Sequence, residues 1–208
     1  MTLESNDGDL SIHVVSGLPS FLAADRLEAA MLAEAGLAPG DRRVPDRGSP
    51  TAFHVAMGSH GEALGVACTT IGPLPDLPIG LALARAGVAV DRHTPLPGPT
   101  CEMVSLAVEP GADGGGIAEA LYRSFYLRAR RHPAQSLAIG VDPWVFDILR
   151  EQYGVPFQVL GPPLDLLGRE LLPVGGEMGA LEAGVAERAP RFHAFLTGPL
   201  DPHGSASR

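Results

Sequence analysis

Hydrophobic positions follow two different spacings along the chain. Short runs rich in β-branched residues predict strands, and apolar residues three or four positions apart predict helices. The predicted strands are residues 10–16, 51–57, 63–71, 101–109, 136–141, 157–160 and 170–174. The predicted helices are residues 19–36, 79–89, 117–131, 143–153 and 180–196. The pattern therefore predicts an α/β (α+β) protein with helices flanking a central sheet.

The connections indicate how the strands pair. Four or five polar residues separate residues 51–57 from residues 63–71, which predicts an antiparallel hairpin. A long connection rich in Pro and Gly, residues 72–100, precedes the next strand. No internal repeat is visible, and 208 residues suit one domain. We expect this domain to span residues 1–178, with a further helix over 179–197 packed on it and a disordered tail over 198–208.

Composition narrows the class of protein. Hydrophobic residues make up 45% of the chain and charged residues 19%, which is typical of a globular protein. All 15 basic residues are arginine, so a Schiff-base or P-loop lysine is excluded. The formal net charge of -9 argues against a nucleic-acid binder. The seven histidines show no metal-ligand spacing with each other or with cysteine, so no metal site is predicted.

The chain also predicts a cytoplasmic location. No apolar run is long enough to cross a membrane, and the first ten residues lack the apolar core of a signal peptide. The two cysteines, Cys68 and Cys101, suit a reducing compartment. Buried and inert thiols are the expectation for both, because no histidine lies at a suggestive spacing.

A glycine-rich turn is the sharpest local signal. In residues 108–122, VEPGADGGGIAEALY, a strand ends, glycines turn the chain and a helix begins. Backbone N–H groups at such a helix start can hold a pyrophosphate, since the helix dipole favours an anion there. A plain strand-to-helix turn is the alternative. The spacing differs from the G-x-G-x-x-G dinucleotide fingerprint.

This segment resembles the GNAT superfamily of acyl-CoA-dependent N-acyltransferases. The family pattern V-x-P, Arg/Gln-x-x-Gly-x-Gly/Ala, then helix, falls on Val108, Pro110, Asp113, Gly116 and Ala118. The predicted order of elements is also that of the family, so the resemblance implies a mixed, mostly antiparallel sheet. It implies an acyl-CoA or acyl-pantetheine thioester as donor, and no metal. The implied donor-binding residues are Leu106, Val108, Gly114, Gly115, Gly116, Ile117 and Ala118.

Within this superfamily the chain looks most like N-acyl amino acid synthases and LuxI-type acyl-homoserine lactone synthases. Their strand motif E-x-S-R-F/L-x-V meets Glu102, Leu106 and Val108, whereas Val104 and Ser105 stand at its Ser and Arg positions. The resemblance implies a donor on acyl carrier protein. That donor lacks the CoA pyrophosphate, which Asp113 would repel.

Two residues of this strand are the catalytic candidates, Glu102 and Ser105. Glu102 is the one carboxylate in an otherwise apolar strand, so desolvation should raise its pKa toward that of a useful general base. A solvated or arginine-paired glutamate is the alternative. Arg150 stands where the superfamily usually has its general-acid tyrosine, and Tyr153 lies nearby.

Arginines and aromatic residues supply further candidates. Arg123, Arg128, Arg130 and Arg131 form either a docking patch for acyl carrier protein or CoA phosphate, or a solvated helix face. Trp144, Phe146, Phe125 and Tyr126 line an acyl pocket or serve as core aromatics.

The resemblance predicts an N-acyltransferase that moves an acyl group from a carrier-protein or CoA thioester to a small amine, such as an amino acid. Alternatives are an acetyl-CoA-dependent N-acetyltransferase and a non-catalytic protein of the same fold that binds a thioester.

Overall fold

A computed structural model describes residues 2–4, 10–15, 18–34, 36, 51–90, 96–109, 111–112, 116–166 and 168–198. Its strands are β1 (Thr2–Glu4), β2 (Leu10–Val15), β3 (Ala52–Gly58), β4 (Ala63–Pro73), β5 (Pro99–Val108), β6 (Ser136–Val141), β7 (Gln158–Val159), β8 (Leu164–Leu166) and β9 (Arg169–Glu177). Its α-helices are α1 (Leu18–Glu34), α2 (Pro78–Arg85), α3 (Ile117–Arg131), α4 (Pro143–Glu151), α5 (Met178–Arg188) and α6 (Pro190–Thr197).

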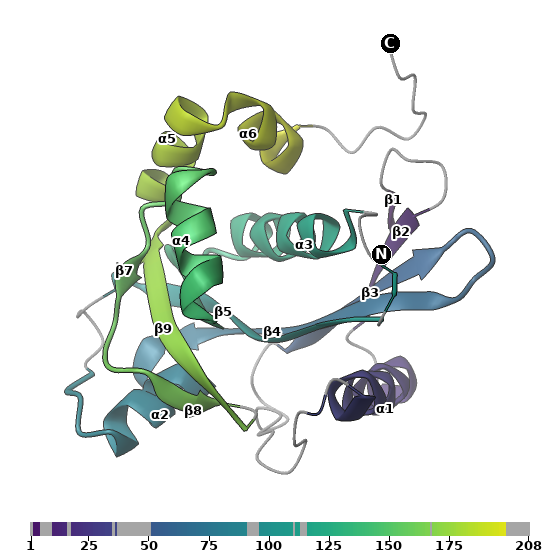
Figure 1. Ribbon diagram of the computed structural model, residues 1–208, viewed down its shortest axis with the longest axis horizontal. Coiled ribbons are helices and arrows are strands. Elements are labelled where there is room, and N and C mark those ends of the chain that lie inside the picture. The colour runs from purple at the N-terminus through teal and green to yellow at the C-terminus, as the bar shows by residue number, and fades with distance from the viewer. Residues whose placement is uncertain are drawn as a thin grey trace.

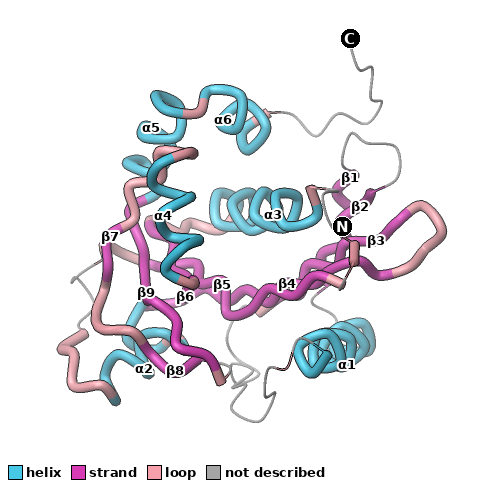
Figure 2. The backbone as a smooth tube through the Cα atoms, in the orientation of Figure 1, coloured by secondary structure: helices cyan, strands magenta, loops and turns pink. Residues whose placement is uncertain are grey.

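The strands form one mixed sheet in the order β1-β2-β3-β4-β5-β6-β9-β7, and β8 pairs with β9. All strand pairs are antiparallel except β5 with β6. Helices α1 and α2 cover one face of the sheet, and α3 to α6 lie on the other (Figures 1 and 2). The predicted fold class and its mostly antiparallel sheet are confirmed.

Three groups of buried side chains hold these layers together. The largest joins the sheet to α3, α5 and α6 and includes Leu121, Phe125 and Leu181. The second lies under α1 and includes Leu32 and Phe53. The third lies under α2. Burying a large apolar side chain contributes about 1.5–3 kcal/mol, so these groups fix the helices on the sheet.

A β-bulge in β5 changes which face its residues occupy. Cys68 of β4 lies opposite Ser105, but the next residue, Thr69, lies opposite Met103, so Val104 is the extra residue. A bulge inverts the alternation of side chains beyond it. Ser105 consequently lies on the α1 side of the sheet, whereas Leu106 packs on the α3 side.

The predicted single C-terminal helix over residues 179–197 is wrong. The structure has two helices there, α5 and α6, separated at Ala189. Pro190 is the cause, because proline has no N–H to continue the helix and disfavours helical geometry in the residue before it. Ala189 accordingly has φ −133° and ψ 66°. The tail over residues 199–208 lies outside the described residues.

The remaining differences concern short elements and the ends of longer ones, such as α2, which ends at Arg85 and not at residue 89. The pattern of hydrophobic residues missed β1 and β8, which have three residues each. Helix α3 and strand β6 begin and end where predicted. None of the helices that the structure describes is long and apolar enough to cross a membrane.

Candidate active site

The parallel strands β5 and β6 separate partway along their length. They pair from Thr100 to Met103 on β5, opposite Ser136 to Ile139 on β6, and their pairing ends there. Beyond that point a cavity of about 200 Å³ lies between them, lined by residues of both strands. We call it the split cavity. Within the described strands, no strand pairs with β5 on this side from residue 104 onward.

Polar groups of four kinds face the split cavity. Ser105 lines it from β5, with its hydroxyl turned toward Glu28 of α1, and Tyr122 lines it from α3. Asp142 and Arg169 also line it, and their side chains form an ion pair with 2.8 Å between Arg169 Nη2 and Asp142 Oδ1. The lining residues thus carry a hydroxyl, a phenol and both signs of charge.

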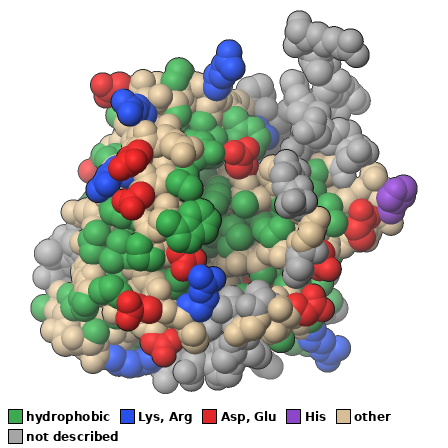
Figure 3. Space-filling model, viewed as in Figure 1, with side chains coloured by type: hydrophobic (Ala, Val, Ile, Leu, Met, Phe, Trp, Pro, Cys, Tyr) green, Lys and Arg blue, Asp and Glu red, His purple; other side chains and the backbone are tan. Residues whose placement is uncertain are grey.

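A second, larger cavity of about 310 Å³ lies on the opposite face of the sheet from α1, between α3, α4, α5 and α6. We call it the chamber. Its walls are almost wholly apolar and include Tyr122, Phe125, Val145, Leu149, Leu181, Val185, Phe192 and Leu196. Figure 3 shows hydrophobic side chains around a hollow between α4 and α3. Tyr122, Ile139 and Val145 line both cavities, so the chamber adjoins the split cavity.

Hydrogen bonds and ring contacts connect the helices around the chamber. Tyr153 after α4 donates to Glu119 of α3 at 3.1 Å, and its ring packs against Phe192 of α6 at 4.4 Å. Tyr126 of α3 donates to Glu182 of α5 at 2.5 Å. Burial and this carboxylate raise the pKa of Tyr126, so its phenol stays protonated. These links hold the chamber open between four helices.

The chamber takes in several of the predicted aromatic residues. Trp144, Phe125 and Tyr126 line it, but Phe146 is not among its lining residues. Phe125 and Tyr126 are also buried core residues, so they serve both as lining of the chamber and as core aromatics. Arg150 forms exposed ion pairs with Asp147 and Glu151 on the outside of α4.

Tyr122 is the polar side chain that the two cavities share. Burial raises the pKa of its phenol, so the hydroxyl remains a proton donor at neutral pH. Among the described residues its hydroxyl has no hydrogen-bond partner. A bound ligand can therefore gain a hydrogen bond from this phenol without breaking one within the described part of the protein.

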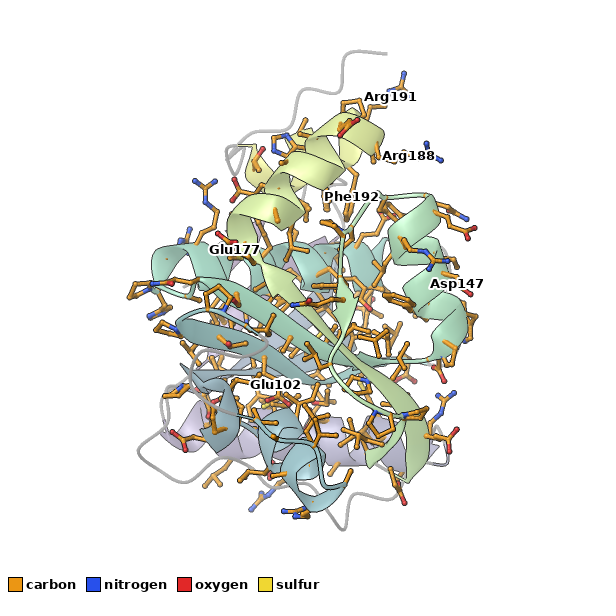
Figure 4. All side chains as sticks on the ribbon, turned by 90° about the vertical axis from the view of Figure 1, so that its left-hand side faces the viewer. Glu102, Asp147, Glu177, Arg188, Arg191 and Phe192 are labelled. Atoms are coloured by element: carbon orange, nitrogen blue, oxygen red, sulfur yellow. The ribbon has the colours of Figure 1, made fainter. Side chains whose placement is uncertain are left out.

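Glu102 lies away from both cavities. Its two carboxylate oxygens accept the backbone N–H of Ile79 at 3.0 and 3.2 Å, at the start of α2. Figure 4 places Glu102 on the α2 side of the sheet, across from Phe192 on α6. Burial raises the pKa of Glu102 to about 8, partly offset by this hydrogen bond, which confirms the predicted direction. The geometry is that of a helix cap supplied by a neighbouring strand.

Ser105 does reach the split cavity, and it bonds to a residue that sequence reasoning missed. Its hydroxyl donates to the carboxylate of Glu28 on α1. Glu28 is fully buried, on the helix whose Ala24 and Leu32 belong to the apolar group under α1. Glu28 falls in line with Ala24, Met31 and Leu32 at helical spacing, so a carboxylate in an apolar stripe was the available signal.

The implied donor-binding residues divide between described and undescribed parts of the chain. Leu106 lines the split cavity, Val108 packs on the same face, and Ala118 lines the chamber. Ile117 is buried in the core. Gly116 caps α3 with φ 66°, a left-handed conformation that favours glycine. Gly114 and Gly115, like Pro110 and Asp113, lie outside the described residues.

The four arginines of α3 do not form one surface. Arg123 is half-buried against α6, where it donates to the Gly198 carbonyl at 3.2 Å and lies 5.0 Å from the Phe195 ring. Arg128 is half-buried, whereas Arg130 and Arg131 are exposed. Arg130 lies 3.7 Å from Glu182.

A buried Ser–His pair lies elsewhere under α3. His54 contacts Ser124 through Nδ1 at 2.6 Å and Thr69 through Nε2 at 2.9 Å. Thr69 donates its hydroxyl to the Ala52 carbonyl, so it accepts from Nε2–H and Ser124 donates to Nδ1. Burial first, and the charge of Arg128 second, lower the pKa of His54 to about 3. The pair lines neither cavity, and its role is structural.

Both cysteines are buried, as predicted, and neither forms a disulfide. Burial raises the pKa of the Cys101 thiol to about 12, so it stays protonated. In the described part of the chain, no three His, Cys, Asp or Glu side chains come together as metal ligands would.

Solved structures share this architecture. FeeM, an N-acyl amino acid synthase from uncultured soil microbes, matches 86% of this chain and 96% of its own with a TM-score of 0.62 and 13% identity. TofI, solved with an inhibitor and MTA, matches 88% and 98% with a TM-score of 0.57 and 17% identity. NAA60 of Arabidopsis thaliana, in complex with acetyl-CoA, matches 80% and 96% with a TM-score of 0.51 and 15% identity.

At these identities the likeness shows the fold: the chain has the fold of GNAT-type acyltransferases, and the predicted resemblance is confirmed at that level. No protein-family model and no curated protein matches the sequence.

Proposed function

We propose that this protein is an N-acyltransferase that moves a fatty acyl group from a pantetheine thioester to a small amine. The observation that carries the proposal is the split cavity and its junction with the chamber at Tyr122, Ile139 and Val145. A thioester in the split has an apolar space beside it for its acyl chain. The fold shared with acyltransferases supports the same function.

The exposed edge of β5 suits a pantetheine donor. Pantetheine carries two amides in an extended chain, and such a chain can pair with an unpaired strand edge as an added strand would. The edge beyond Met103, including Leu106 and Val108, lies next to the split cavity. We infer that this edge orients the thioester, which lowers the entropy cost of bringing it to the amine.

Groups around the split cavity supply the remaining chemistry. The phenol of Tyr122 can donate to the thioester oxygen as negative charge develops, or to the departing sulfur. Arg169 uses one guanidinium nitrogen in its ion pair with Asp142, which leaves donors for an acceptor that carries a carboxylate. An amino acid is therefore the acceptor class that we favour.

Two features bear on the donor. Apolar walls of the chamber favour a long acyl chain over acetyl, because each buried methylene contributes about 0.8 kcal/mol. Arg130 and Arg131, exposed at the end of α3, are the part of the arginine cluster that can meet an acidic carrier protein. We expect carrier-protein thioesters to be at least as good as CoA thioesters, because Asp113 would repel the CoA pyrophosphate.

An assay for product tests the proposal. Purified protein is incubated with decanoyl-carrier protein, decanoyl-CoA or acetyl-CoA and a mixture of the twenty amino acids. Thiol release and N-acyl products are then measured. We expect amine-dependent release and an N-decanoyl amino acid. Preference for acetyl-CoA would indicate the acetyltransferase alternative, and binding without release would indicate a non-catalytic protein.

A further inference from the structure

Helix α1 carries a carboxylate where its pattern calls for an apolar residue. Glu28 is 0% exposed, and its helix buries Ala24, Met31 and Leu32 in the apolar group under α1. Burying a carboxylate is costly unless it is hydrogen-bonded or used. The hydroxyl of Ser105 on β5 bonds to it. The contact spans 77 residues of sequence and joins α1 to the strand that forms one wall of the split cavity.

The bulge at Val104 makes this contact possible. Without an extra residue in β5, strict alternation would turn Ser105 to the α3 side, because side chains of a strand alternate between faces. With the bulge, Ser105 faces α1 and still lines the split cavity. Ser105 is therefore both a lining residue of the cavity and the hydrogen-bond partner of a carboxylate that is not in the cavity lining.

The reaction proposed above needs a proton acceptor at this place. The amine nitrogen forms a C–N bond to the thioester carbonyl carbon, and the C–S bond breaks. The nitrogen must lose a proton and the sulfur must gain one. A hydroxyl that already donates to a carboxylate can accept a proton from nitrogen while passing its own on.

We propose that Ser105 and Glu28 form a proton relay for amine acylation, an inference that rests on the proposed function. The amine proton passes to Ser105 Oγ as the Ser105 proton passes to the Glu28 carboxylate. The departing thiolate takes a proton from the Tyr122 hydroxyl. Solvent then reprotonates Tyr122, and the Glu28 proton returns through the Ser105 hydroxyl to solvent that enters the split cavity after product release. Ser105 is the catalytic residue that touches the amine, and Glu28 acts through it.

Other ionisable groups on the α1 face are few. Alternation places His13 of β2 on that face, and Cys68 of β4 lies opposite Ser105. Glu102 lies on the same face of β5 and bonds to the start of α2. On α1 itself, Asp25 and Arg26 flank the turn before Glu28. Of these, Glu28 is the one bonded to a hydroxyl in the split cavity.

Kinetics of four variants test the relay in the full-length protein. We expect kcat to fall about a hundredfold or more in Glu28→Gln and Ser105→Ala, with KM for the acyl thioester changed less than about threefold. Ser105→Thr keeps a hydroxyl and should retain most of kcat. The double variant Glu28→Gln with Ser105→Ala should lose no more than either single variant, because the two residues act as one unit.

The pH–rate profile separates a relay from a structural role. We expect the limb of kcat that rises with pH in the wild type to be absent in Glu28→Gln. Ser124→Ala, which removes a buried serine hydroxyl from His54, is the matched control and should keep kcat within about twofold. If Glu28→Gln folds poorly, Ser105→Ala and Ser105→Thr still decide the question.

Three results would overturn the relay. The first is a Ser105→Ala variant with kcat within about threefold of an active wild type. The second is a loss after Glu102→Gln as large as after Glu28→Gln, which would return the base to Glu102. In both cases the proposed function stands. Wild-type protein that transfers no acyl group to any amine would overturn the proposed function and the relay together.

Discussion

Two buried glutamates on one face of the sheet show that the role of a residue depends on its surroundings. Glu102 could be singled out from sequence because it is a carboxylate in the apolar strand CEMVSLAV. Its role as a cap for α2 could not, since that depends on where residues 78–79 meet β5 in three dimensions. Glu28 was missed because α1 also carries other acidic residues, and only packing shows which one is buried.

The raised pKa of Glu102 makes the stability of the protein depend on pH. An unfolded glutamate titrates near 4.5 and the folded one near 8, so between these values the folded state binds a proton that the unfolded state does not. The free energy of unfolding should therefore decrease as pH rises from about 4.5 to 8. Glu102→Gln removes this dependence and keeps an oxygen for the Ile79 N–H.

We expect Glu102→Gln to leave stability nearly unchanged at pH 4.5 and to raise it by a few kcal/mol, about 1.4 per unit of pKa shift at most, at pH 8.5. Urea unfolding at both pH values measures this. Glu187→Gln, at an exposed position of α5, is the control and should change stability by less than about 0.5 kcal/mol. Destabilisation of Glu102→Gln at pH 8.5 would show that the ionised carboxylate stabilises the fold.

A second prediction for a single residue concerns the phenol of Tyr122. Its hydroxyl has no hydrogen-bond partner among the described residues, so Tyr122→Phe should fold with an unchanged melting temperature. We expect kcat for acyl transfer to fall about ten- to a hundredfold, because the developing charge loses a donor. Tyr153→Phe, which removes a hydroxyl bonded to Glu119, serves as the comparison. Equal rates for Tyr122→Phe and wild type would place the proton donor elsewhere.

Elements were predicted best where one pattern ran without interruption. Helix α3 and strand β6 have the predicted ends because regular apolar spacing continues to both. The break between α5 and α6 was missed, although Pro190 was the available signal. The bulge at Val104 has no signature in the sequence, and it decides which face Ser105 occupies. The strand could therefore be predicted from the sequence, whereas the direction of its Ser105 side chain could be seen only in the structure.

The start of α3 gives a prediction for the donor site. Gly116 has φ 66°, and a Cβ there would meet nothing closer than Glu119 at 3.9 Å. Asparagine adopts this left-handed conformation readily, whereas valine does not. The Gly116→Val variant should therefore be about 1–2 kcal/mol less stable. We expect Gly116→Asn to weaken binding of acyl-CoA, measured by calorimetry, with a near-native melting temperature. An unchanged affinity would remove this helix start from the donor site.

At the scale of the whole molecule, the order of elements was predictable, because each strand and helix is local. The sequence did not predict that β5 separates from β6, or that four helices meet around one chamber. These depend on contacts between residues far apart in the chain, such as Tyr126 with Glu182. The arginine cluster shows the same limit, since α3 directs Arg123 toward α6 and leaves Arg130 exposed.

Surface charge gives a prediction about the carrier. We expect the double variant Arg130→Glu with Arg131→Glu to lower kcat/KM for acyl-carrier protein about five- to tenfold at low salt, and to change it less than about twofold for acyl-CoA. The reason is repulsion of an acidic partner, which salt should weaken. Arg85→Glu, exposed on α2 across the sheet, is the control. Equal losses with both donors would argue against a docking role.

The acyl chain of a thioester in the split cavity should extend into the chamber. The most direct test is kcat/KM against acyl length, from acetyl to dodecanoyl, for wild type, Ala118→Phe and Ala84→Phe. Ala118 lines the chamber, whereas Ala84 is exposed on α2. We predict a rise of about fourfold per methylene in wild type and Ala84→Phe until the chamber fills, and an earlier plateau in Ala118→Phe. A preference for acetyl, or one chain-length profile for all three proteins, would contradict the account.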